Sequence, residues 1–330
     1  MSIAVKYGMI IELHEIVLNR GVFVKNTKQL TETAILLALY MIFFAFAFFV
    51  PLLGLLFVWV LPLPFVVNTV RNGRNATIGM FIAALVLSLF FTIAAVPLTW
   101  TFASAGFVIG EMFRRKKSSF QILLAGTLTY IVNFVLLYII MVVFTGLNPV
   151  TETMNSVKAT LDSMQAMSGL PEGTEEQMEA LFAQLDFITY LVPSMLIIGA
   201  IVFALITQLI SGFILKRLQY DVQSWKPFYE WSLPRSLIFY YLIVLILAII
   251  GLEEGTTLFV LVANLEILLG YAMVLQGFTV IFAFSKIKEW SLAVPVLITI
   301  GSFLLMFPLQ LVKLLGILDL GLNLRSRMKS

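Results

Sequence analysis

One carboxylate stands out in this sequence because it lies within an almost wholly apolar run. Glu266 occurs in the stretch NLEILLGYAMVLQGF, residues 264–278, inside an apolar segment that begins near residue 256. At a rise of 1.5 Å per residue it would lie about 15 Å deep, near the middle of a bilayer core about 30 Å thick. Inserting an acidic residue there costs about 2.5–3.5 kcal/mol, so Glu266 is expected to face protein or water rather than lipid.

Two interpretations of Glu266 follow from this position. In the first, Glu266 lines a central cavity with Gln276 and Asn264 and binds a ligand. In the second, a protonated Glu266 bonds to a backbone carbonyl or an Asn and ties helices together, because polar side chains also strengthen packing in membranes. Gly270 and Gly277 share its helix face, which predicts the close approach of another helix.

Other polar and aromatic side chains in apolar segments are candidates for a binding site. Tyr130 and Asn133 are three residues apart and so share a helix face. Trp59 lies in a segment interrupted by Pro62 and Pro64, and broken membrane helices often line cavities. Packing within a helix bundle is the alternative role for each of them. The candidate ligand-binding residues are therefore Glu266, Gln276, Asn264, Asn133, Tyr130 and Trp59.

The residue types needed for most catalysis are missing from the apolar segments. The sequence has no Cys, and its one His, His14, lies in the N-terminal 24 residues. It contains no GxxxxGK[ST] phosphate loop and no HExxH metal motif. A Ser nucleophile would lack a His base, and Glu266 has no second acid at its depth. We therefore expect no enzyme activity, no metal site and no cofactor, and any ATP-driven step would be powered by another polypeptide.

Membrane helices must position these side chains. The 330 residues are 61% hydrophobic and 12% charged, with a mean hydropathy of +1.02, which predicts an all-α polytopic membrane protein. The net charge of +3 does not indicate nucleic-acid binding, because Lys and Arg fall in short clusters between apolar runs. About nine stretches approach the length of a membrane helix; they are 31–50, 52–70, 76–96, 98–113, 119–146, 188–215, 236–250, 256–284 and 291–312.

The distribution of Lys and Arg predicts a cytoplasmic N-terminus. Clusters at 25–28, 71–74, 114–117, 216–226 and 286–288 would then all lie inside. The segment 147–187 would lie outside; it holds one Lys and seven acids, and two apolar stripes at helical spacing predict two amphipathic helices. Arg325 would lie outside after nine crossings, and Pro308, Lys313 and Asp319 make 308–324 a poor full span. The alternative is that this segment folds back as a re-entrant or interfacial helix.

Several stretches of the sequence resemble known families. From about residue 25, including NLEILLGYAMVLQGF and the ending LGILDLGLNLRSR, the chain is similar to the YybS-type bacterial membrane proteins. LTETAILLALYMIFFAF at 30–46, LPLPFVVNTVRNGRNATIGMFIAAL at 61–85 and GFVIGEMFRRKK at 106–117 resemble the substrate-binding S subunits of energy-coupling factor transporters.

The second resemblance implies a helical solute-binding subunit energised by a transmembrane coupling subunit and an ATPase. In S subunits an AxxxA motif on the first helix contacts the coupling subunit, and Ala34 and Ala38 match that spacing. Small residues four apart also serve packing within a bundle. The outer insertion and the helices after residue 188 depart from the compact S-subunit pattern.

These observations divide the chain into four parts. Residues 1–24 are expected to be a poorly ordered extension, and we hypothesise that the native start is Val24. Residues 25–146 form an S-subunit-like transmembrane half, 147–187 an extracytoplasmic helical insertion, and 188–330 a second transmembrane half. We expect a multi-pass protein of the bacterial inner membrane that binds a small solute or lipid group. The alternative is a scaffold or regulator that docks a signalling or envelope-assembly partner at cytoplasmic loops 71–75 and 114–118.

Overall fold

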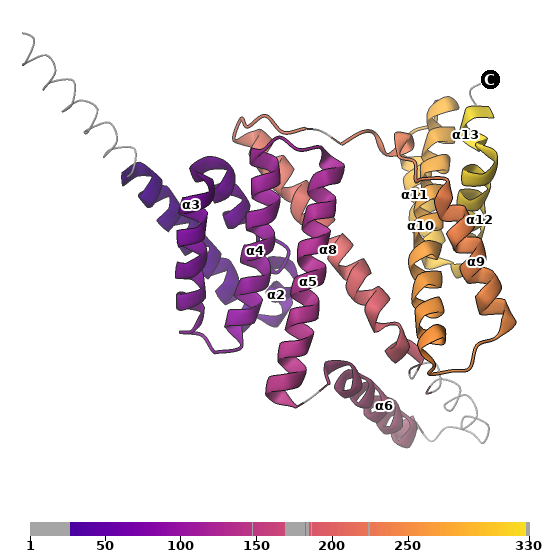
Figure 1. The fold of residues 1–330 in the computed structure, drawn as a ribbon, viewed down its shortest axis with the longest axis horizontal. Coiled ribbons are helices and arrows are strands. Elements are labelled where there is room, and N and C mark those ends of the chain that lie inside the picture. Colours follow the sequence, from indigo (N-terminus) through magenta and orange to yellow (C-terminus); the bar gives the residue numbers. More distant parts are fainter. Residues whose placement is uncertain are drawn as a thin grey trace, which may run out of the picture. The chain divides into compact units, whose positions relative to one another are not determined.

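A computed structural model of the chain confirms the all-α class. It describes residues 27–146, 148–168, 182, 185, 187–223 and 225–327, and no β-strand occurs among them. The predicted extension, residues 1–24, lies outside the described residues. The chain divides into two compact units, drawn in Figure 1: unit 1 is Met1–Ile140 with Gly199–Gln223, and unit 2 is Met141–Ile198 with Ser224–Ser330.

Unit 1 is built from one long first helix and four labelled helices. The first helix is Thr27–Phe49. The others are α2 (Pro51–Phe57), α3 (Leu63–Ser88), α4 (Ala95–Arg114) and α5 (Ser119–Thr145), completed by the later part of α8 (Val192–Arg217). α3 bends sharply at Gly73, where φ is 84°, a left-handed value that favours glycine.

Unit 2 is centred on α10, the longest helix described. Its helices are α6 (Pro149–Ser168), the start of α8, η1 (Phe228–Glu230), α9 (Ser236–Ile250), α10 (Thr257–Ile287), α11 (Ala293–Leu304), α12 (Met306–Leu322) and α13 (Leu324–Arg327). Thr256 caps α10, because its side chain accepts a hydrogen bond from the Phe259 N–H.

Helices α10 and α12 pack backbone to backbone. A Cβ atom at Gly277 would collide with the carbonyl oxygen of Val312, and one at Gly316 would collide with the carbonyl oxygen of Met273. The two helices therefore depend on glycine for their contact, as small residues allow in membrane helix pairs. This confirms the close approach predicted for the face of α10 that carries Gly277.

The number of membrane helices is smaller than the nine predicted. Among the described residues, five helices are long and apolar enough to cross a membrane, or six if α11 and α12 are one bent span. The predicted span 52–70 is wrong because the chain turns at residues 58–62, around Pro62, between α2 and α3. The predicted span 236–250 is a helix of only 15 residues.

The predicted span 291–312 is not one straight helix, because the chain bends by 118° between α11 and α12. Lys286 at the end of α10 and Arg325 after α12 line the same pocket. The chain therefore enters α11 and leaves α12 at the same end of unit 2. This geometry favours the re-entrant alternative and removes the conflict between Arg325 and the other basic clusters.

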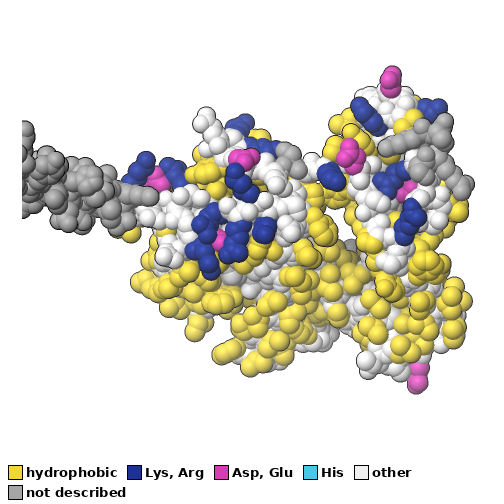
Figure 2. All heavy atoms as spheres, turned by 45° about the horizontal axis from the view of Figure 1, so that its top comes forward, with side chains coloured by type: hydrophobic (Ala, Val, Ile, Leu, Met, Phe, Trp, Pro, Cys, Tyr) yellow, Lys and Arg dark blue, Asp and Glu magenta, His cyan; other side chains and the backbone are white. Residues whose placement is uncertain are grey.

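Charged and apolar side chains separate on the surface of each unit. Figure 2 shows Lys and Arg gathered at one end of each unit, with hydrophobic side chains covering the sides. In unit 1, Arg71 pairs with Glu32 at 2.7 Å, and Lys116 pairs with Asp221 at 2.7 Å. The apolar sides fit a hydrocarbon environment, and the basic ends fit a membrane surface.

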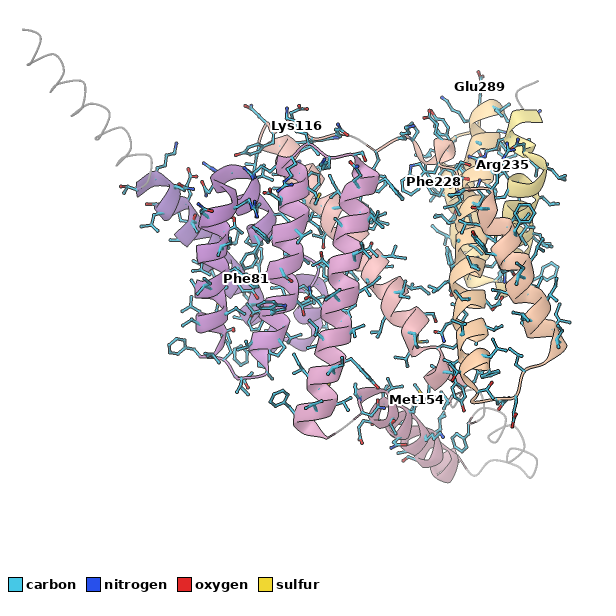
Figure 3. The ribbon with its side chains drawn as sticks, viewed as in Figure 1. Phe81, Lys116, Met154, Phe228, Arg235 and Glu289 are labelled. Atoms are coloured by element: carbon cyan, nitrogen blue, oxygen red, sulfur yellow. The ribbon has the colours of Figure 1, made fainter. Side chains whose placement is uncertain are left out.

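Helix α6 confirms the first of the two helices predicted in the insertion 147–187. It carries Met154, which Figure 3 labels. Most of the second predicted helix lies outside the described residues.

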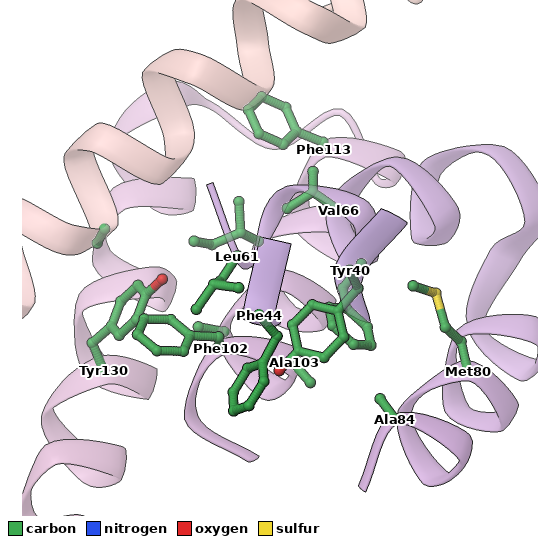
Figure 4. Close-up of a cluster of buried hydrophobic side chains, with 14 of the residues drawn as sticks. Tyr40, Phe44, Leu61, Val66, Met80, Ala84, Phe102, Ala103, Phe113 and Tyr130 are labelled. Carbon is green, nitrogen blue, oxygen red and sulfur yellow. The ribbon is translucent and has the colours of Figure 1, made fainter. Parts of the chain in front are cut away.

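The core of unit 1 is aromatic and holds a few internal hydrogen bonds (Figure 4). Tyr40 is fully buried, packs edge-on against Phe65 with ring centroids 4.9 Å apart, and bonds to Thr99 at 3.0 Å. The bond satisfies a hydroxyl that would otherwise be costly to bury.

Candidate functional site

Glu266 forms an ion pair with Lys313 of α12. The Lys313 Nζ donates a hydrogen bond of 2.9 Å to Glu266 Oε1. The two side chains are 32% and 20% exposed, so the pair is only partly covered by protein. Lys313 Nζ also lies 5.2 Å from the centre of the Tyr241 ring, which adds a cation–π contact. The partner of Glu266 is thus a cation, and neither the carbonyl nor the Asn of the packing interpretation.

Glycine makes the space for this ion pair. A Cβ atom at Gly270 would lie 3.1 Å from Lys313 Nζ and 3.8 Å from Glu266 Oε1. The first distance is tighter than ordinary van der Waals contact. The missing side chain at Gly270 therefore lets the ammonium lie against α10.

Two hollows open beside Glu266. One has a volume of about 220 Å³ and is lined by Glu266, Gly270, Gln310 and Lys313, among others. The second has a volume of about 370 Å³, and its walls are apolar side chains such as Phe259 apart from Glu266 itself. Glu266 therefore borders a polar hollow on one side and an apolar hollow on the other.

This arrangement can recognise a charged group. A carboxylate and an ammonium at this depth neutralise each other, which lowers the cost of burying either one. A ligand with a cation could replace Lys313 at Glu266, and a ligand with an anion could replace Glu266 at Lys313. The apolar hollow can cover the hydrocarbon part of the same ligand.

Gln276 is buried and belongs to a second polar network. Its Nε2 donates to Asp319 at 2.6 Å, and its Oε1 accepts from the Leu233 N–H at 2.9 Å. Asp319 also accepts from Arg325 Nε at 2.9 Å. At 1.5 Å per residue, Gln276 lies about 15 Å along α10 from Glu266. The structure does not bring these two predicted residues together.

Asn264 of α10 forms hydrogen bonds with the start of α8. Its Oδ1 accepts from the Ser194 N–H at 2.7 Å, and its Nδ2 donates to the carbonyls of Tyr190 and Val260, both at 2.7 Å. Every polar group of the amide has a partner. The contacts are those of a packing residue.

The other three candidates lie in unit 1, where Asn133 and Tyr130 are buried and Trp59 is half-buried. Asn133 donates to Ser104 Oγ at 2.8 Å, Tyr130 bonds to Thr207 at 3.0 Å, and Trp59 stacks on Phe203 with ring centroids 4.3 Å apart. Figure 4 shows Tyr130 within the buried cluster. Of the six candidates, Glu266 has the clearest access to a hollow.

Ala34 and Ala38 are exposed on the first helix. Their exposure is compatible with the predicted contact to a coupling subunit, which stays a prediction. No group of three His, Cys, Asp or Glu side chains that could hold a metal ion occurs among the described residues.

The partners of Glu266 and Gln276 were not predicted from the sequence. Lys313 and Asp319 were weighed only as features that weaken the segment 308–324 as a span. The sequence does contain a feature that predicts the Glu266–Lys313 pair. A lone Glu and a lone Lys in separate apolar segments are expected to pair, since an unpaired charge there is costly.

Comparisons with known proteins support the membrane assignment. Residues 38–320 match the family described as "Predicted membrane protein (DUF2232)". The chain is 30% identical over 311 residues to a Bacillus subtilis (strain 168) protein named "Uncharacterized protein YybS", covering 92% of this chain and 100% of the relative. These matches confirm the resemblance to the YybS-type proteins. No solved structure matches, so the resemblance to S subunits stays a prediction.

Proposed function

This chain belongs to the DUF2232 family of predicted membrane proteins, and on that premise we propose that it binds a small charged solute or lipid group at Glu266 and Lys313. The observation that carries the proposal is the partly exposed ion pair between two hollows in the apolar body of unit 2. Ionisable groups at membrane depth mark ligand sites and ion pathways. The proposed role is binding without catalysis, in the inner membrane of a bacterium.

The exposed fraction of the pair distinguishes binding from packing. A purely structural ion pair gains most when both groups are covered and all their hydrogen bonds are made, as at Asp319. Glu266 is instead 32% exposed, and Lys313 is its one ion-pair partner among the described residues. A carboxylate oxygen is therefore left for a ligand.

Glu266→Gln is expected to leave the protein folded and to abolish retention of the native ligand. Gln keeps the size and the hydrogen bonding but removes the charge that a cationic or zwitterionic group would meet. Native mass spectrometry of protein purified from its own membranes would identify the bound small molecule and measure its loss. Glu254→Gln, at an exposed acid between α9 and α10, is the matched control. Unchanged ligand retention with a lower melting temperature would make Glu266 a packing residue.

A more specific proposal is that the protein is a transporter subunit energised by a coupling subunit and an ATPase. It rests on the resemblance to S subunits and on the exposed Ala34 and Ala38, where a coupling subunit would pack against the first helix. The energy would come from an ATPase that belongs to another polypeptide.

A cluster of arginines favours the second candidate, a scaffold that docks an acidic partner. Buried Glu111 pairs with Arg115 at 2.7 Å and Arg114 at 2.8 Å, and Arg74 Nε lies 4.0 Å away. One carboxylate therefore orders three half-exposed arginines at the end assigned to the cytoplasm. Their net positive charge would attract an acidic surface.

Co-purification separates the two candidates. If the protein is a transporter subunit, Ala34→Leu with Ala38→Leu should remove a co-purifying ATPase and its membrane subunit, because the larger side chains separate the helices. If it is a scaffold, Arg114→Gln with Arg115→Gln should remove an acidic partner, and the Ala variants should not. Recovery of the ATPase subunits with the Ala variants at the wild-type level would contradict the transporter proposal.

A further inference from the structure

A third pocket lies at the C-terminal end of α10, away from the proposed ligand site. Its volume is about 620 Å³, and its lining includes Glu230, Arg235, Lys286 and Arg325. Ligand pockets commonly measure about 300–1,000 Å³. At 1.5 Å per residue, Lys286 is roughly 30 Å along the helix from Glu266. An activity of this pocket is therefore independent of the function proposed above.

The pocket lining carries more positive than negative charge, and some of its cations have no acidic partner. It contains three cations, Arg235, Lys286 and Arg325, and two acids, Glu230 and Asp319, for a net charge of +1. Asp319 is already paired with Arg325 at 2.9 Å. Arg235 and Lys286 are exposed and have no ion-pair partner in the part of the chain that the structure describes. Two cations are thus available to an incoming anion.

The guanidinium of Arg325 is held in place by the protein. Its Nε donates to Asp319, its Nη1 donates to the carbonyl of Trp231 at 2.6 Å, and the side chain is 17% exposed. Its Nη2 has no hydrogen-bond partner within the described ranges. A fixed guanidinium loses little conformational freedom on binding, and its planar donors suit phosphate oxygens.

The start of α9 adds to the positive potential of the pocket. Arg235 is the N-cap residue, no side chain caps the helix, and no acid lies in its first turn. A helix N-terminus carries partial positive charge, which favours anions bound nearby.

Aromatic side chains next to the pocket are of the kind that lie at the depth of lipid headgroups. Trp225 stacks on Trp231 with ring centroids 4.9 Å apart, and Phe228 contacts both Trp231 and Phe282. Figure 3 shows Phe228 and Arg235 at the same end of unit 2 as Glu289, beyond the last turn of α10. Trp is enriched at membrane interfaces, and basic pockets there bind anionic headgroups.

We propose that this pocket binds a phosphate group, with Arg325 as the fixed donor and Arg235 and Lys286 as the mobile cations that complete the site. Two sources share this chemistry: the headgroup of an anionic phospholipid and a soluble phosphate ester.

The test uses the full chain in a neutral detergent with two probes, phosphatidylglycerol and glycerol 3-phosphate, and diacylglycerol as the phosphate-free lipid reference. Native mass spectrometry measures binding to the wild type and to Arg235→Gln with Lys286→Gln. Each cation contributes roughly fivefold to the affinity, so the double variant should bind roughly 30-fold more weakly. Arg235→Lys with Lys286→Arg keeps both charges and should retain binding.

The matched control is Lys226→Gln with Lys288→Gln, which removes the same charge from exposed positions outside the pocket lining. It should change binding less than twofold. Selective binding of phosphatidylglycerol supports a lipid source, and selective binding of glycerol 3-phosphate supports a soluble one. The proposal is overturned if the wild type prefers neither probe to diacylglycerol, or if both double variants weaken binding equally.

Discussion

Asp319→Ala should lower the free energy of unfolding by about 3–5 kcal/mol, the largest effect expected of any substitution considered for this protein. The Asp319 side chain is 3% exposed and accepts hydrogen bonds from Arg325 Nε, the Arg325 N–H and Gln276 Nε2. Removing it leaves a largely buried guanidinium and a buried amide without their acceptor. The cost of these unpaired groups exceeds the net value of the ion pair itself.

Thermal and denaturant unfolding in one detergent would measure this effect. Asp221→Ala is the matched control, because it also breaks an Asp–cation pair, but one whose Lys116 and Asp221 side chains are 65% and 79% exposed. Exposed pairs contribute little, so the control should unfold like the wild type. Asp319→Ala combined with Arg325→Ala should cost less than the sum of the two single changes. Equal melting temperatures for Asp319→Ala and Asp221→Ala would refute the burial argument.

Gly316→Ala should destabilise the protein by roughly 1–3 kcal/mol, the range typical of overpacked cores. The added Cβ would collide with the Met273 carbonyl oxygen and the Gly277 nitrogen, both backbone atoms that no rotamer change can move. α10 and α12 would have to separate. Because the same two helices carry Glu266 and Lys313, ligand retention should fall with stability.

The sign of the change in unfolding free energy shows whether Gly316 is required for the contact between α10 and α12. Gly→Ala inside a helix is normally favourable by about 1 kcal/mol, because Ala loses less conformational freedom. Gly301 of α11 has no heavy atom within 4 Å of an added Cβ, so Gly301→Ala should be neutral or stabilising in the same unfolding assay. A stabilising Gly316→Ala would show that the two helices are not packed through glycine.

The α10–α12 pair is thus the frame of unit 2. Lys313 reaches Glu266 and Asp319 reaches Gln276 across the same interface, so the ion pair and the hydrogen bond both depend on the approach that Gly277 and Gly316 allow. One helix pair positions the proposed ligand site near its middle and the phosphate pocket at its end.

The sequence alone determined the properties that depend on residues close together along the chain. Hydropathy and the clusters of basic residues identified an all-α membrane protein, and the charge of Glu266 showed that this position needed a partner. The helical period placed Gly270 and Gly277 on one face, which the structure confirms as a contact surface. Each of these inferences uses a single segment and the cost of placing its residues in hydrocarbon.

Only the tertiary structure decided which segments meet. Lys313 lies 47 residues after Glu266, and no local pattern indicates that α12 runs back beside α10. The same fold assigns Gln276 to Asp319 and Asn264 to the start of α8, and it brings Arg325 to Lys286. A buried polar group must find a partner, but the choice of partner is a long-range contact that depends on how helices pack.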